Sequence, residues 1–358
     1  MNIYLTIYSI LSFFTLLEIR FRKYSSIIFI FFLLFFLILG SIRWNTGTDW
    51  DPYYLFFVTN DNWRNFEYSG FEFENGYVLL NYFIKNISDS YSFFLFICSF
   101  INISCFYYFS KIFLGGRPIF ALLLYFAIFQ GGIFVTRQLL ATSICLLSTI
   151  FIIKRNKLSF FICIAFASLF HISSLIFIIS YYLYEYRISV KKFVGILFIT
   201  ILASIFIRVV LENFISLIGD YQRLSGKLTT YVNQQEEFGI INLAKGIVKR
   251  ILILPVFFYI RKKHNSSNIY NGLLSIYLLG TILYFLFACA NLTVFIRISS
   301  LFQLMELPLL YYSYKLYRKK WFICFIIIFC AMKTISFYSG NSDLYIPYYT
   351  IFDTNIQR

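Results

Sequence analysis

Residues 25–42 read SSIIFIFFLLFFLILGSI, an apolar run without a charged side chain. A transmembrane helix needs about 20 mainly apolar residues to cross about 30 Å of hydrocarbon, so this run predicts a membrane span. The whole chain has the same character, because 60% of its 358 residues are hydrophobic, 13% are charged and its mean hydropathy is +0.75. A soluble domain carries about 25% charged residues. The sequence therefore predicts an all-α polytopic integral membrane protein with a single transmembrane domain over residues 1–358.

Similar apolar runs follow along the chain and predict about 12 transmembrane segments, within a range of about 10–12. The predicted segments are 2–17, 25–42, 91–109, 118–135, 138–153, 158–170, 172–184, 193–211, 241–260, 270–290, 293–312 and 321–338. The runs 158–170 and 172–184 are short for a full crossing. They leave open a re-entrant pair hinged at His171.

The formal net charge of +15 is explained by the positive-inside rule, and it does not indicate a nucleic-acid partner. Basic clusters fall in every second connection, at 20–23, 111–117, 154–157, 187–192, 261–263 and 315–320. We therefore expect these connections to be cytoplasmic and both termini to lie outside. The outer side then carries the long loops 43–90 and 212–240 and the tail 339–358. The first segment has no basic residues before it, which predicts an uncleaved span.

Several chemistries lack their sequence signatures. There is no P-loop, no GxGxxG opening a helix and no HExxH, which disfavours ATP-driven, nicotinamide and zinc-hydrolase activities. The seven cysteines lie in apolar runs without CxxC spacing, so we interpret them as packing thiols, neither disulfide-bonded nor metal-binding. We expect no cofactor and no metal.

The first outer loop carries Arg43, Asp49 and Glu74 among aromatic residues. In a functional interpretation Arg43 binds an anionic head group, and Asp49 or Glu74 serves as a carboxylate base. In the alternative, Arg43 snorkels to the interface within an aromatic belt. The tryptophans of this loop suit either a belt or stacking on sugar rings.

Two further polar residues lie where predicted outer loops meet spans. Arg137 follows Gly131–Gly132 and opens a span, where the helix N-terminus already favours an anion. It binds a phosphate or snorkels at the interface. His171 marks the tip of the short pair and is either an acid–base group or a satisfied interior histidine.

Ionisable residues also occur inside two later predicted spans. Arg297 and Glu306 lie within one of them, where charges are costly and normally face a cavity or a partner. Lys249 and Arg250 enter the ninth span from outside. They either line an anion cavity, or that helix begins later, near Ile251.

Outer cations beside carboxylates and a histidine suit a phosphorylated donor and an alcohol acceptor. Guanidinium groups bind pyrophosphate with fixed geometry and keep their charge, so they could stabilise a leaving diphosphate.

At these residues the sequence resembles the EpsG-type, Wzy-like bacterial polysaccharide polymerases. The matching elements are R-x3-G-x-D-x3-Y (Arg43, Gly47, Asp49, Tyr53), E-x-G-Y (Glu74, Gly76, Tyr77), R-Q (Arg137, Gln138), F-H-x-S (Phe170, His171, Ser173), a late helical arginine (Arg297) and Pro347–Tyr348.

The resemblance implies a metal-independent glycosyltransferase that joins undecaprenyl-diphosphate-linked oligosaccharide repeat units of O antigen or exopolysaccharide. It implies a bacterial inner-membrane protein with a periplasmic or extracellular active face and is compatible with a GT-C-like arrangement. Its expected partners are the lipid-linked oligosaccharides, membrane lipid, and chain-length regulator and flippase proteins of the same pathway. Asp49, His171 and Glu74 would be the catalytic residues, with Asp49 as first choice for the base. The substrate-binding residues would be Arg43, Arg137, Gln138, Arg297, Lys249, Arg250, Gly47, Tyr53 and Tyr77.

Two other functions fit the same features. An O-antigen ligase-type glycosyltransferase needs the same diphosphate site. A flippase or transporter for the lipid-linked unit suits many spans with intramembrane charges, although transporter sites normally lie near the midplane.

Overall fold

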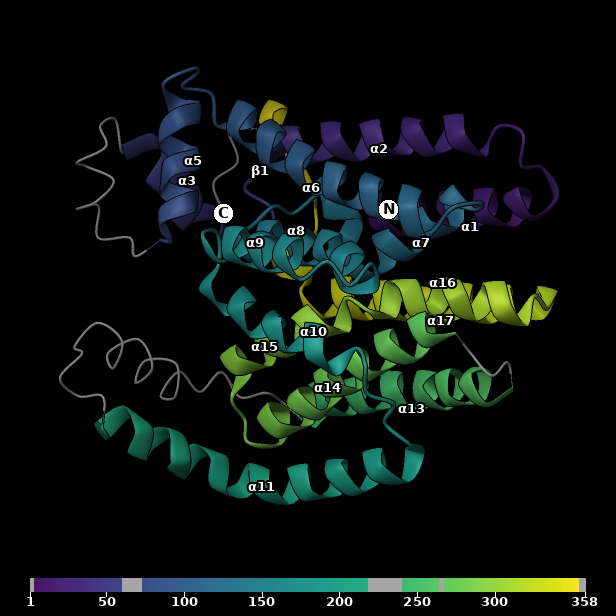
Figure 1. The fold of residues 1–358 in the computed structure, drawn as a ribbon. Coiled ribbons are helices and arrows are strands. Elements are labelled where there is room, and N and C mark those ends of the chain that lie inside the picture. The colour runs from purple at the N-terminus through teal and green to yellow at the C-terminus, as the bar shows by residue number, and fades with distance from the viewer. Residues whose placement is uncertain (1–2, 60–72, 218–239, 264–266, 354–358) are drawn as a thin grey trace. The chain divides into compact units, whose positions relative to one another are not determined.

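The computed structural model describes residues 3–59, 73–217, 240–263 and 267–353, and most of this part of the chain is helical (Figure 1). Most of the predicted loop 212–240 lies outside the described residues, as do residues 60–72 of the first outer loop and 354–358 of the tail. Within the described residues, seven helices are long and apolar enough to cross a membrane. They span Ile3–Arg20, Ser25–Ile42, Tyr91–Phe113, Val190–Ile207, Asn268–Cys289, Thr293–Tyr317 and Lys320–Gly340. The prediction of an all-α polytopic membrane protein is confirmed.

The remaining predicted spans correspond to shorter or more charged helices. Four shorter apolar stretches cover Pro118–Gly132, Arg137–Ile153, Lys157–Ser168 and Ile172–Leu183. The predicted span 241–260 lies in α13, Ile240–Lys263. Because this helix carries Lys249 and Arg250 in its interior, the alternative that it begins near Ile251 is wrong.

The chain forms two compact units, one comprising Met1–Leu175 with Arg318–Arg358 and the other Ile176–Tyr317. A division by contacts does not define independently folding domains, so the single transmembrane domain stays a prediction. The boundary between the two units, after Leu175, falls inside the predicted short pair 158–170 and 172–184. The second member of this pair is a 3-10 helix, η2 (Ile172–Ile178), followed by the short α10 (Ile179–Leu183).

The first unit is built around helix α7. Its elements are α1 (Ile3–Arg20), α2 (Ser25–Ile42), β1 (Arg43–Trp44), α3 (Trp50–Thr59), α5 (Asn75–Lys85), α6 (Tyr91–Phe113), α7 (Pro118–Phe129), η1 (Gln130–Gly132), α8 (Arg137–Ile153), α9 (Lys157–Ser168), α17 (Lys320–Gly340), α18 (Ser342–Tyr345), β2 (Tyr349–Thr350) and η3 (Ile351–Asp353). Helix α7 is apolar on all sides and packs against α1, α2 and α17, as expected for a central helix (Figure 1). Helix α6 packs against both α2 and α8, and α8 also packs against α9.

The start of α7 is held by a carboxylate from α1. The Glu18 oxygens accept hydrogen bonds from the backbone N–H groups of Ile119 and Phe120, at 3.1 and 3.0 Å. The first N–H groups of a helix have no partner within the helix, and they favour a negative charge. Glu18 is 1% exposed, so this contact fixes α1 against α7 inside the protein.

A tight turn after α7 determines where α8 begins. Gln130, Gly131 and Gly132 have positive φ angles of 51°, 66° and 71°. A side chain at Gly132 would meet the Asn102 amide at 2.3 Å, so this close approach requires glycine. The Thr136 hydroxyl oxygen then accepts a hydrogen bond from the Leu139 N–H at 3.2 Å and caps α8.

The C-terminal segment folds back onto the loop that follows α2. Strands β1 and β2 pair antiparallel, with Arg43 opposite Thr350 and Trp44 opposite Tyr349. The Gly47 N–H donates to the Leu344 carbonyl at 2.7 Å. The predicted first loop and the described part of the predicted tail thus form one structure.

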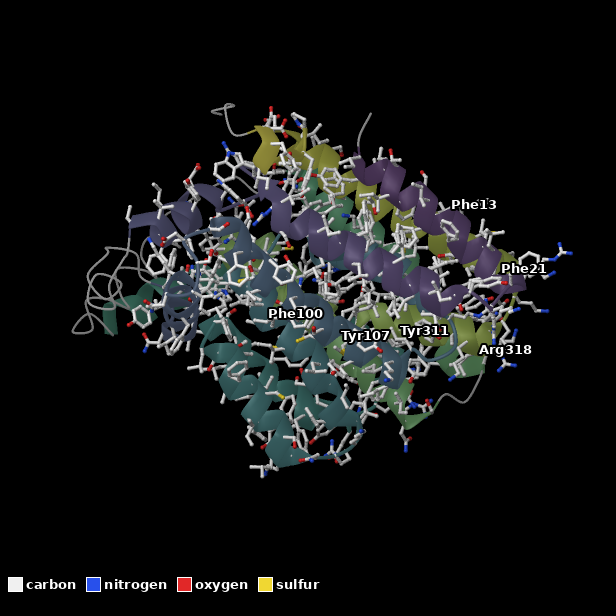
Figure 2. The ribbon with its side chains drawn as sticks, turned by 90° about the horizontal axis from the view of Figure 1, so that it is seen from above. Phe13, Phe21, Phe100, Tyr107, Tyr311 and Arg318 are labelled. Atoms are coloured by element: carbon white, nitrogen blue, oxygen red, sulfur yellow. The ribbon has the colours of Figure 1, made fainter. Side chains whose placement is uncertain are left out.

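Large apolar side chains remain exposed on the helices of this unit. Phe13 of α1 is 59% exposed, Ile27 and Phe31 of α2 are 69% and 64% exposed, and Phe100 of α6 is 53% exposed. Figure 2 labels Phe13 and Phe100. Exposed apolar surface of this extent suits contact with lipid acyl chains.

The second unit is built around α14 (Asn268–Cys289), which packs against α11 (Val190–Leu217), α13, α15 (Thr293–Gln303) and α16 (Glu306–Tyr317). The predicted span 293–312 is interrupted between α15 and α16 at Leu304 and Met305. Pro308 explains the break, because its ring clashes with the carbonyl four residues earlier, at Leu304.

Candidate functional site

Three polar residues far apart in the sequence meet in the first unit. Glu74 immediately precedes α5, Arg137 is the first residue of α8, and His171 follows the end of α9. Their side chains are 18%, 19% and 26% exposed. We call them the Glu74 triad.

The Glu74 carboxylate joins the other two members. Its Oε2 forms an ion pair with Nη1 of Arg137, while Oε1 lies 3.1 Å from Nδ1 of His171. The backbone N–H of Ile172 also donates to Oε1, at 3.3 Å. Both oxygens are therefore engaged, and the carboxylate fixes the positions of the cation and the imidazole.

The same contacts set the charge of Glu74. Burial acts to raise its pKa, but the hydrogen bond with His171 and the charge of Arg137 together outweigh burial and lower the pKa below its usual range. A carboxylate that stays ionised and fully hydrogen-bonded is a weak proton acceptor. Glu74 is thus better suited to orienting His171 than to accepting a proton itself.

This pKa shift predicts how the stabilising effect of Glu74 depends on pH. A lowered native pKa gives a contribution that is present above the ordinary value of 4.5 and is lost as pH falls through the lower native value. We expect Glu74→Gln to lower the melting temperature of the detergent-solubilised protein at about pH 7, and the difference from the wild type to disappear only as pH falls below about 4.5. The groups that face Glu74 are Arg137 and His171. A difference that vanishes between about pH 7 and about pH 5.5 would contradict an ionised Glu74.

Gly76 allows α5 to approach the end of α9. Its N–H donates to the Leu169 carbonyl oxygen at 2.9 Å. A Cβ atom at this position would lie 2.5 Å from Leu169 Cβ and 2.7 Å from the same carbonyl oxygen. The glycine of the E-x-G-Y element therefore lets Glu74 reach His171.

Gly76→Ala is expected to separate the two segments and to destabilise the protein by about 1–3 kcal/mol, as for other overpacked sites. The loss is measured as a lower melting temperature of the purified protein. Gly195→Ala is the matched control, because a Cβ there meets no atom within 4 Å. Equal melting temperatures for Gly76→Ala and wild type would show that the close approach is not needed.

Aromatic rings surround the Arg137 guanidinium. The Cζ atom of Arg137 lies 4.2 Å from the centre of the Phe73 ring and 5.7 and 6.0 Å from the ring centres of Tyr53 and Tyr77. Its Nε donates to the Tyr53 hydroxyl at 3.4 Å. These contacts hold the arginine in place while part of it remains exposed. Gln138, the next residue of α8, is half-buried.

Asp49 and the tyrosines lie at different depths beside this cluster. Asp49 is exposed, has a positive φ of 58°, and interacts electrostatically with Tyr53. Tyr77 is 2% exposed and packs 5.5 Å from Tyr53, ring to ring. The structure thus brings Tyr53 and Tyr77 to Arg137 of the Glu74 triad, and places Asp49 near Tyr53.

Arg43 is buried in the same unit and contacts the protein itself. It is 1% exposed, and its guanidinium donates to the carbonyl oxygens of Thr46 and Val135 at 3.0 and 3.2 Å. It also lies 5.1 Å from the ring centre of Trp50. A Cβ at Gly47 would lie 3.0 Å from its Nη1. The snorkelling interpretation of Arg43 is wrong, and these contacts suit a residue that shapes the loop.

The other predicted cations belong to the second unit and are described with it. Arg250 is 7% exposed, donates to the Gly246 carbonyl at 2.9 Å, and stacks 3.4 Å from the ring centre of Tyr284. Lys249 is half-buried on α13, and Arg297 is exposed on α15. Their roles in substrate binding stay predictions.

Sequence reasoning missed two contributors to this region. Phe73 stacks on Arg137, and the Thr46 hydroxyl accepts a hydrogen bond from the Tyr349 N–H at 3.0 Å. A phenylalanine in a chain with 47 of them gives no separate signal, and the Thr46 contact spans 303 residues. Among the residues that the structure describes, no group of three or more His, Cys, Asp or Glu could hold a metal ion.

A model of the EpsG family matches residues 26–350 of the chain. The chain belongs to the EpsG family. The resemblance drawn from the motifs is confirmed, and membership indicates a polysaccharide-polymerase type of role with lipid-linked saccharide substrates at a membrane. Searches of curated proteins and of solved structures found no match. The match to the EpsG family includes every member of the Glu74 triad.

Proposed function

We propose that this EpsG-family protein is a glycan polymerase. It would transfer a growing glycan from undecaprenyl diphosphate to a sugar hydroxyl of another undecaprenyl-diphosphate-linked repeat unit. The observation that carries the proposal is the Glu74 triad, in which one carboxylate orients both a guanidinium and an imidazole. Such a pairing suits a reaction with a diphosphate leaving group and a hydroxyl nucleophile.

The proposed step assigns one role to each member of the triad. With its Nδ1 proton directed to Glu74, His171 has Nε2 available as a base. The acceptor hydroxyl loses its proton to Nε2 as its oxygen bonds to the anomeric carbon. The bond from that carbon to the diphosphate oxygen breaks, and the leaving group keeps the electron pair. Arg137 supplies a permanent positive charge to the diphosphate.

This assignment changes the first choice for the base from Asp49 to His171. Asp49 is exposed and lies near Tyr53, whereas the imidazole is held by a partly buried carboxylate that also pairs with the cation. Arg43 becomes a positioning residue in the proposal, because it is buried and its Nη1 and Nη2 donate to backbone carbonyls.

We further propose that the site faces the outer leaflet of the bacterial inner membrane, with both termini outside. The basic clusters support this orientation. Helix α2 follows the cluster 20–23 and ends beside Arg43, and α8 begins at Arg137 and ends beside the cluster 154–157. Arg43 and Arg137 thus lie at the opposite ends of these helices from the basic clusters, as the positive-inside rule requires for an outer site.

The test is a gel profile of surface polysaccharide from a deletion strain complemented with the wild-type protein. A polymerase predicts single repeat units in the deletion strain and long chains after complementation. Long polymer without transfer to its final acceptor in the deletion strain would instead indicate a ligase. Loss of all repeat units from the surface would indicate a flippase. Either result would overturn the proposal.

A further inference from the structure

A cavity of about 480 Å³ lies at the end of the first unit that carries the basic clusters. It opens between the start of α2, the last turns of α6 and the Gly115–Gly116 connection that leads into α7. Its volume is within the range of small-molecule sites, about 300–1,000 Å³. It lies at the end of α2 opposite to Arg43, so it is separate from the Glu74 triad.

The polar side of the cavity is cationic. Arg22 and Lys111 line it, and within the described chain none of the lining residues is acidic. The acidic residue of α1, Glu18, does not line the cavity. Its two carboxylate oxygens accept hydrogen bonds from the N–H groups of Ile119 and Phe120. The exposed Ser26 adds a hydroxyl group to the lining. These side chains suit an anion with several acceptor oxygens, such as a phosphate.

The other side of the cavity is apolar and continues into the exposed helix faces. Phe29 and Ile30 of α2 and Tyr107 of α6 line it, and the Tyr107 ring lies 5.8 Å from Lys111 Nζ. Beyond them, Ile27 and Phe31 are 69% and 64% exposed. Figure 2 labels Tyr107 and Phe100, both on α6. A bound phosphate would therefore have room for attached acyl chains along α2 and α6.

We propose that this cavity binds the phosphate head group of an anionic glycerophospholipid. Basic cavities between membrane helices are suited to such head groups on the side where the basic clusters lie. The apolar lining favours a lipid over a free phosphate, because only a lipid uses both sides of the cavity. The site would tie the connections α1–α2 and α6–α7 to the surrounding membrane, independently of the chemistry at the triad.

The test measures binding of dioctanoyl phosphatidylglycerol to the purified full-length protein in detergent. The charge variant Arg22→Gln/Lys111→Gln is expected to weaken binding about thirtyfold. The matched control Lys154→Gln/Lys157→Gln removes two exposed charges from the same end of the unit but not from the cavity. It is expected to bind as the wild type does. Binding is compared only among variants whose melting temperature and size-exclusion profile equal those of the wild type.

Further measurements separate a bound lipid from a soluble anion and from general surface attraction. Ser26→Phe keeps both cations but places a bulky ring in the cavity lining, and it is expected to reduce binding as strongly as the charge variant. Dioctanoyl phosphatidylcholine is expected to bind at least about tenfold more weakly than phosphatidylglycerol. Competition by millimolar inorganic phosphate would indicate a soluble anion and overturn the lipid assignment. Equal losses in the charge variant and its control would indicate only general surface attraction, with the same consequence.

Discussion

Arg137→Ala is expected to abolish long-chain polysaccharide in the complemented deletion strain while single repeat units still reach the surface. The guanidinium is the charged group beside His171 that could neutralise a leaving diphosphate, and it is anchored by Glu74 and Phe73. Loss of one such transition-state contact lowers rates by about 10²–10³-fold. In a reconstituted assay with purified protein and lipid-linked repeat units, kcat/KM should fall by at least about 100-fold.

A control must separate this loss from misfolding, because alanine leaves the partly buried Glu74 without its ion-pair partner. Arg137→Lys keeps a positive charge but not the planar fork of donors. It should be expressed at the wild-type level and still lose most of the polymerase rate. Arg20→Ala is the matched control, since Arg20 is exposed at the C-terminal end of α1 and its Cζ lies 5.6 Å from the centre of the neighbouring Phe21 ring. Wild-type chain length in Arg137→Lys would refute a bidentate role for this arginine.

The long apolar helices could be predicted from the sequence alone. The run 25–42 coincides with α2, and the predicted starts of 91–109 and 118–135 coincide with those of α6 and α7. Spans follow local hydropathy, which needs no knowledge of distant contacts. The break at Leu304 was predictable in principle, since Pro308 is visible in the sequence, but a hydropathy run conceals it. The 3-10 geometry of η2 has no such local signal.

The members of the site could be predicted better than their roles. Glu74, Arg137 and His171 were all identified from motifs, but the contact from Glu74 to His171 spans 97 residues and depends on how α5 docks against α9. Only that geometry shows that both Glu74 oxygens already have partners. Asp49 is the first choice for the base from the sequence, because sequence does not distinguish an exposed carboxylate from one placed beside a cation.

Arg43 shows why the contacts around the other candidate residues could not be predicted from the sequence. An arginine at the end of a span is normally expected to snorkel toward water. Here Trp50, Phe134 and the paired strands β1 and β2 enclose it, and Nη1 and Nη2 donate to two carbonyl oxygens. Strand β2 belongs to the C-terminal segment, about 300 residues away in the chain. No local pattern around Arg43 indicates that distant partner.

The second large effect is expected from His171→Gln, which should lower kcat by about 10²–10⁴-fold, the usual contribution of a general base. Glutamine can still hydrogen-bond to Glu74 but cannot accept a proton at the position of Nε2. Binding of the lipid-linked repeat unit should be nearly unchanged, because Arg137 and its partners stay in place. The measurement is a reconstituted polymerase assay together with an equilibrium binding assay on the same preparations.

The comparison with Asp49→Asn decides which residue is the base. If His171 accepts the proton, His171→Gln loses kcat at constant binding, whereas Asp49→Asn keeps most of it, because this exposed carboxylate is not aligned by a partner as the imidazole is. The reverse pattern would return the role to Asp49 and leave His171 as a structural partner of Glu74. Glu74→Gln separates the cases further. If Glu74 acts by orienting the imidazole and stabilising its charged form, its loss should lower kcat in the wild type but add little to the defect of His171→Gln, since residues that act as one unit are not additive.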